Sequence, residues 1–235
     1  MQRVETLFLD AGGVLVHPNW SRVSGVLATH GVHVDAATLA AAEPLAKQRL
    51  DVGATIDATD DRQRGWLYFN LVLTQGGVTL SGRTEAALAE LHTYHATHNL
   101  WETVPADVVP ALDRLRALGL RIAIISNANG TLRAAFDRLG LTSRVDVLVD
   151  SCEEGVEKPD PRLFQIGLER IGGRRETTLH VGDLYHVDVV GARTAGLRAV
   201  LLDPHGLYEG YDCARVRSLH EIGDLLARDH DHDHG

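Results

Sequence analysis

A carboxylate follows a short apolar run near the start of the chain. Residues 4–16, V-E-T-L-F-L-D-A-G-G-V-L-V, lead from that run into Asp10, one alanine and two glycines. Such a run, ended by turn residues, is typical of a buried strand. In an open parallel sheet the carboxyl ends of the strands line the crevice where ligands bind, which would place Asp10 for chemistry. The stretch also fits a strand and a Gly-Gly turn in which Asp10 only caps the backbone.

Polar side chains follow three further predicted strands. They are Ser126 and Asn127 after 121–125, Asp150 and Lys158 after 145–149, and Asp183 and Asp188 after 178–181. A single polar residue before a helix is usually an N-cap. A nucleophilic carboxylate, a hydroxyl, an ammonium group and a pair of acids at one sheet edge suit phosphate chemistry with Mg²⁺ better than capping.

Two kinds of hydrophobic periodicity divide the chain. From Trp20 to about His98 the apolar residues recur at helical spacing and predict four helices, with Pro44 kinking or interrupting the second. After residue 105, helices and strands alternate, which indicates βαβ units and a parallel sheet. We therefore predict an α/β core with an all-helical insertion behind the first strand. The alternating Asp and His residues of 229–235 are expected to lack a fixed structure.

Composition narrows the class of protein. The 235 residues are 44% hydrophobic and carry a formal net charge of −9, which gives no basic field for nucleic acid or an anionic membrane surface. Two cysteines make no disulfide framework, and no apolar run approaches the length of a membrane span. We expect a cytoplasmic protein that acts on a small molecule as a monomer or homodimer.

Four motifs in a fixed order resemble those of the haloacid dehalogenase superfamily, subfamily I. They are D-A-G-G-V-L at 10–15, I-I-S-N at 124–127, G-V-E-K-P-D-P at 155–161 and V-G-D-L-Y-H-V-D at 181–188. The resemblance implies a Rossmann-like core formed by residues 1–16 and 103–235, and an α-helical cap of the C1 type at 17–102. It also implies a Mg²⁺ cofactor, a phosphorylated substrate and hydrolysis through a covalent aspartyl intermediate.

The resemblance assigns a role to each matching residue. Asp10 resembles the nucleophile, Ser126 the ligand of a phosphate oxygen, and Lys158 the cation that holds nucleophile and phosphoryl group. The expected substrate-binding residues are Ser126, Asn127, Gly12 and Gly13. The expected Mg²⁺ ligands are Asp10, Gly12, Asp183 and Asp188.

Gly12 departs from the pattern of the superfamily's phosphatases. These carry D-x-D, in which the second aspartate protonates the leaving group and then activates water. Gly12 has no such side chain, although its carbonyl can still bind Mg²⁺. Losing a positioned acid or base costs roughly 10²–10⁴ in rate, or about 3–5 kcal/mol of barrier. We expect activity that is weak or restricted to good leaving groups.

Three functions remain open. The first is a phosphatase-type hydrolase, for which His17 and His186 are the nearest substitute proton shuttles, although each also fits an exposed loop histidine. The second is hydrolysis of a carbon–halogen bond, which needs no second aspartate but leaves the acids Asp183 and Asp188 unexplained. The third is a binding or regulatory protein that keeps the fold without turnover, although binding alone would not need Asp10.

Overall fold

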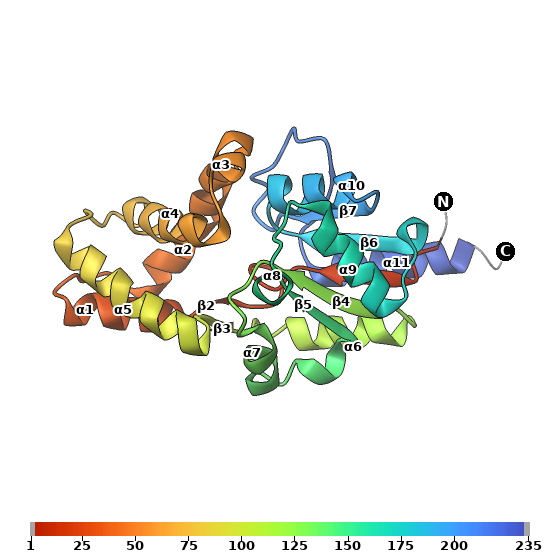
Figure 1. Cartoon of the computed structure of the whole chain (residues 1–235), viewed down its shortest axis with the longest axis horizontal. Helices are drawn as coiled ribbons and strands as arrows, with labels where there is room; N and C mark the ends of the chain where they lie inside the picture. Colours follow the sequence, from red (N-terminus) through yellow and green to blue (C-terminus); the bar gives the residue numbers. More distant parts are fainter. Residues whose placement is uncertain (1–2, 233–235) are drawn as a thin grey trace. The chain divides into compact units, whose positions relative to one another are not determined.

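The apolar run before Asp10 forms strand β1 (Thr6–Leu9), whose four residues are all buried. In the computed structural model, which describes residues 3–232, β1 lies inside a six-stranded sheet of order β5-β4-β1-β6-β7-β8 (Figure 1). The other strands are β4 (Arg121–Ser126), β5 (Val147–Asp150), β6 (Thr178–Gly182), β7 (Arg198–Leu202) and β8 (Ala214–Val216). All neighbouring strands run parallel. The predicted α/β, Rossmann-like class is confirmed.

Helices lie on both sides of this sheet (Figure 1). One face carries Phe8 and Ile125, which pack in a single apolar cluster with residues of α9 (Pro161–Ile171) and α10 (Gly191–Thr194). Side chains alternate along a strand, so Leu7 and Leu9 are buried on the opposite face. Helices α6 (Val108–Ala117) and α11 (Leu219–His232) are joined by an ion pair between Arg114 and Asp224.

The order of the strands determines where a ligand site can form. From β1 the chain passes to β4 and β5 on one side, and then returns to β6, β7 and β8 on the other. The crevice of such a sheet lies beyond the carboxyl ends of its strands, where the direction of winding reverses. In this chain that point is the end of β1, directly before Asp10.

A second compact unit, residues 18–103, interrupts the first, which comprises residues 1–17 and 104–235. These borders differ by one residue from the expected ones. The second unit contains helices α1 (Trp20–Thr29), α2 (Ala36–Leu50), α3 (Gly53–Ala58), α4 (Asp61–Gln75) and α5 (Gly82–His98). Its core is a single cluster to which α1, α2, α4 and α5 each contribute buried apolar residues. A two-stranded sheet, β2 (His17–Pro18) with β3 (Trp101–Thr103), lies where the chain enters and leaves this unit.

Two expectations about the elements were wrong, and one was wrong in part. The prediction of four helices missed α3, a six-residue helix that buries only Ile56 and so leaves no periodic signal. Of the two alternatives for Pro44, a kink or an interruption, the interruption was wrong, because α2 continues from Ala36 to Leu50. The C-terminal helix α11 reaches His232, so 229–232 are helical, while 233–235 lie outside the described residues. Among the described residues, no helix is both long and apolar enough to cross a bilayer.

Candidate active site

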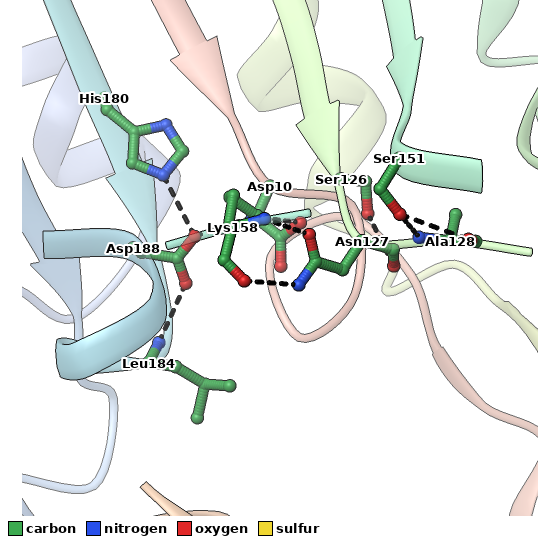
Figure 2. Close-up of polar contacts among 9 residues, drawn as sticks. All are labelled: Asp10, Ser126, Asn127, Ala128, Ser151, Lys158, His180, Leu184 and Asp188. Carbon is green, nitrogen blue, oxygen red and sulfur yellow. Dashed lines mark hydrogen bonds and ion pairs between the residues drawn. The ribbon is translucent and has the colours of Figure 1, made fainter. Parts of the chain in front are cut away.

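Asp10 and Lys158 form the centre of a buried polar cluster at the end of β1 (Figure 2). The backbone N–H of Asp10 donates to the carbonyl of Val181 in β6, which holds the end of β1 in place. Lys158 Nζ lies 2.8 Å from Asp10 Oδ1, and the lysine side chain is only 1% exposed. Asp10 Oδ1 is buried against this ammonium group, which leaves Oδ2 as the oxygen that can meet a substrate.

Asp188 holds the same ammonium group from the other side. Lys158 Nζ lies 2.7 Å from Asp188 Oδ1, and His180 Nε2 lies 3.0 Å from that oxygen. The backbone N–H of Leu184 donates to Asp188 Oδ2 at 3.1 Å. Burial alone would raise the pKa of Asp188, but Lys158 and His180 outweigh it and hold that pKa well below its usual range. Asp188 is therefore a fully ionised anchor.

Asp183 completes a group of three acids. One carboxylate oxygen each from Asp10, Asp183 and Asp188 can be chosen so that all three lie within 4.8 Å of one another. Burial and the two neighbouring acids raise the pKa of Asp10 to about 7, although Lys158 acts in the opposite direction. Three carboxylates face one ammonium, so the cluster has an excess of negative charge and offers hard oxygen ligands. Both properties fit a divalent cation of the Mg²⁺ type.

Ser126 and Asn127 lie at the end of β4, the strand next to β1. Ser126 is buried, and within residues 3–232 its hydroxyl makes only a long contact of 3.4 Å with the carbonyl of Asn127. The Asn127 carboxamide binds the backbone of Lys158 twice, accepting from its N–H at 2.7 Å and donating to its carbonyl at 3.0 Å. Asn127 therefore positions the lysine, a role that sequence reasoning missed.

Asp150 has a backbone role instead of a chemical one. Its Oδ2 accepts from the N–H groups of Gly130 and Leu132, and its Oδ1 accepts from the N–H of Cys152. The neighbouring Ser151 hydroxyl accepts from the N–H of Ala128 (Figure 2). One of the four polar strand ends is thus explained by capping, and it holds the loop that follows Ser126.

The residues after Asp10 form a tight turn. Gly13 has a φ of 73°, which favours glycine, and its N–H donates to the carbonyl of Val16. Gly12 pairs with Val16 through a single β-bridge outside the main sheet. His17 begins β2, and the His186 ring packs against Tyr185, with 5.1 Å between ring centroids.

His180 is the member of the cluster that sequence reasoning missed. It lies within β6, opposite Phe8 of β1, and is completely buried. Burial lowers the pKa of His180, although Asp188 opposes this shift. The signal in the sequence was a polar residue inside the apolar run T-L-H-V, because a buried polar side chain needs a partner.

Comparison with known proteins identifies the family. Residues 4–196 match the haloacid dehalogenase-like hydrolases. The chain belongs to this family. It is 36% identical to a ribulose-1,5-bisphosphate 5-phosphatase of Halopiger xanaduensis over 155 residues, 66% of this chain and 62% of that protein. It is 31% identical to a glyceraldehyde 3-phosphate phosphatase of Methanopyrus kandleri over 174 residues, 69% of this chain and 73% of that one.

Solved structures show the same fold. A dehalogenase crystallised as an intermediate complex superposes with a TM-score of 0.68, covering 97% of this chain and 99% of its own, at 23% sequence identity. At this identity the likeness concerns the fold alone. The haloacid dehalogenase-like hydrolase therefore has its family's core architecture, and the chemistry depends on the residues that converge at Asp10.

Proposed function

We propose that this protein is a phosphatase-type hydrolase that forms an aspartyl-phosphate on Asp10. The observation that carries the proposal is the convergence of Asp10, Lys158, Asp183 and Asp188 at one end of the sheet. The acid pair and the phosphatases among the relatives favour a phosphorylated substrate over a halogenated one. The helical unit, residues 18–103, is proposed as the cap that selects the substrate, because it is inserted directly behind the first motif.

The reaction divides into two displacements at phosphorus. Asp10 Oδ2 attacks the phosphoryl group, and the bond to the leaving oxygen breaks with its electron pair on that oxygen. Water then attacks the phosphorus of the aspartyl-phosphate and gives a proton to solvent. The bond between phosphorus and Asp10 Oδ2 breaks with its electron pair on Oδ2, which releases inorganic phosphate and the Asp10 carboxylate. Lys158 Nζ, 2.8 Å from Asp10, stabilises negative charge on the nucleophile and on the phosphoryl oxygens. The Ser126 hydroxyl is proposed to donate to one of those oxygens.

The acids Asp10, Asp183 and Asp188, with the carbonyl of Gly12, are proposed to hold Mg²⁺. When bound, the cation supplies positive charge for the phosphoryl oxygens and favours the ionised form of Asp10. Asp188 Oδ1 already accepts from two side chains, so its Oδ2 is the oxygen with a lone pair to spare.

Gly12 restricts the substrates that the site can use. No side chain at this position can protonate a leaving oxygen, so the first displacement depends on a leaving group that is stable as an anion. Acyl and aryl phosphates have such leaving groups, whereas alkyl phosphates do not. We therefore expect turnover of a small acyl or aryl phosphate to exceed that of an alkyl phosphate by roughly 10² or more.

The test is hydrolysis of p-nitrophenyl phosphate by the purified protein with Mg²⁺. We expect release of phosphate that EDTA abolishes and that Asp10→Asn lowers by roughly 10⁴ or more. Asp146→Asn is the matched control, because Asp146 precedes β5 at the opposite end of the sheet, where it accepts from the N–H of Ile122. Turnover that persists in Asp10→Asn would refute the assignment of Asp10 as the nucleophile.

A second assay separates the two alternatives. Halide release from a 2-haloacid without added metal would select the dehalogenase reaction. If neither phosphate nor halide is released while Mg²⁺ and inorganic phosphate still bind, the protein binds ligands without turnover.

A further inference from the structure

The Lys158 ammonium group lies at the end of a long flexible side chain, so its place beside Asp10 depends on what holds it. Asp188 does this through Oδ1 at 2.7 Å (Figure 2). The Asp188 carboxylate is itself held by two donors from its own part of the chain, His180 Nε2 on Oδ1 and the Leu184 N–H on Oδ2. Asn127 fixes the lysine backbone, and the place of the ammonium group depends in addition on the donors that hold Asp188.

Of these two donors, His180 is the more deeply buried. Its ring lies inside β6 with no exposed surface, and it meets the Phe164 ring edge to face with 5.0 Å between centroids. Its Nδ1 is buried and has no hydrogen-bond partner among the described residues. Because an ionised carboxylate only accepts hydrogen bonds, the Nε2 atom carries a proton that points at Asp188.

Two glycines allow close packing around Asp188 and beside Lys158 and His180. A Cβ at Gly182 would overlap the Cγ of Asp188, so the carboxylate lies directly against the end of β6. A Cβ at Gly191 would lie 2.9 Å from the Cα of Pro159 and 3.0 Å from Phe164. The backbone beside Lys158 and the ring beside His180 thus pack closely against Gly191.

We propose that His180 is a positioning residue for the active site, which acts by fixing the Asp188 carboxylate and through it the Lys158 ammonium beside Asp10. The chain of contacts is His180 Nε2, Asp188 Oδ1, Lys158 Nζ and Asp10 Oδ1, with successive distances of 3.0, 2.7 and 2.8 Å. The kinetic consequence rests on the proposed function, because it assumes that Lys158 acts on the reacting phosphoryl group.

The test compares two substitutions of His180. His180→Phe keeps an aromatic ring against Phe164 but removes the N–H, whereas His180→Gln can return an N–H close to the place of Nε2. With p-nitrophenyl phosphate and Mg²⁺, we expect His180→Phe to lower kcat by roughly 10- to 100-fold with a smaller change in KM. His180→Gln should recover most of that loss. If His180→Phe does not fold, His180→Asn replaces it, because its shorter amide cannot reach Asp188.

A matched control separates positioning from loss of stability. Leu179 is buried next to His180 in β6, and its side chain points to the opposite face of the strand. Leu179→Ala should lower the melting temperature at least as much as His180→Phe and leave kcat near the wild-type value. The proposal is overturned if Leu179→Ala lowers kcat equally, if His180→Phe has wild-type kcat, or if His180→Gln is no better than His180→Phe.

Crystal structures of the wild type and His180→Phe keep this test independent of the proposed function. We expect the distance between Lys158 Nζ and Asp10 Oδ1 to lengthen in the variant beyond hydrogen-bond range. An unchanged distance would overturn the positioning role whether or not any substrate is turned over. Absence of phosphatase activity in the wild type, together with a lengthened distance, would instead refute the proposed function and keep the positioning role.

Discussion

Each of the two units contains a carboxylate that solvent scarcely reaches. In the helical unit the side chain of Glu102 is 11% exposed, and in the sheet unit that of Asp10 is 13% exposed. Glu102 accepts from Arg22 Nε and Asn19 Nδ2 on one oxygen and from the Tyr94 hydroxyl on the other. Its neighbours are therefore donors.

The neighbours of Asp10 are mainly acids. Burial would raise the pKa of Glu102, but its donors outweigh burial and the pKa falls below the usual value. At Asp10 burial and the carboxylates of Asp188 and Asp183 outweigh Lys158, and the pKa rises to about 7. Both side chains are little exposed, yet the shifts are opposite, because burial acts more strongly on Asp10 and the neighbours of Asp10 include two acids. A carboxylate surrounded by donors is held in place. The ionised form of a carboxylate that lies among acids can still be stabilised by a bound cation.

The largest expected effect is on the sheet unit. Lys158→Met removes the ammonium group that faces Asp10 and Asp188 and leaves buried charge uncompensated, so we expect a loss of about 3–5 kcal/mol in the free energy of unfolding. Urea unfolding at pH 7 measures this loss, and p-nitrophenyl phosphate hydrolysis should also fall below detection. Exposed ion pairs contribute under about 1 kcal/mol. A loss in that range would contradict the contrast between the surroundings of Asp10 and those of Glu102.

The second prediction tests the role of the aspartate side chain that Gly12 lacks. Gly12→Asp places a fourth carboxylate beside the cluster, where it can protonate a leaving oxygen, so hydrolysis of an alkyl phosphate should rise by roughly 10². Gly12→Asn is the matched control, since it has the same size without the acid. Equal rates in both variants would mean that another step limits the reaction.

A pH dependence is expected in the helical unit. Burial lowers the pKa of His95 to about 4, below the value of about 6.5 in an unfolded chain. Between these values the unfolded state binds more protons, so this contribution to stability is complete above pH 6.5 and is lost as pH falls toward 4. The free energy of unfolding should fall on acidification by about 1–2 kcal/mol less in His95→Gln than in the wild type. Urea unfolding at pH 7 and pH 4.5 measures it, and unchanged sensitivity would argue against a neutral His95.

The smallest effect concerns the ion pair that holds Glu102. Arg22 is 37% exposed and lies over the Tyr94 ring at 3.9 Å, while Asn19 and Tyr94 continue to donate to Glu102 without it. Arg22→Met should therefore cost only about 0.2–1 kcal/mol, as exposed ion pairs do. Thermal unfolding measures this cost, and a loss as large as that of Lys158→Met would make the two clusters equivalent.

Local patterns were sufficient for most of the core. The apolar runs that became β1, β4 and β6 each end in a polar residue, and helix α9 lies between its N-cap Asp160 and Gly172, as its sequence predicts. Local patterns failed at 187–195, where V-D-V-V-G-A-R-T-A before Gly196 predicts a single helix. The chain instead forms a π-helical turn, Tyr185–Val190, before α10. The N–H of Leu184, the residue before this turn, donates to the Asp188 carboxylate. The same segment also brings Asp188 to Lys158, a contact that is distant in the sequence.

By itself, the sequence determined the fold class and the residue types at the strand ends, because hydrophobic periodicity and turn residues act over a few positions along the chain. Only the tertiary structure decided that Asn127 holds the Lys158 backbone, that Asp150 is a cap, and that His180 reaches Asp188. Lys158 and Asp188 are 30 positions apart, and Lys158 and Asn127 are 31 apart. Whether such groups meet within 3 Å depends on how the parallel strands pair, which no local pattern encodes.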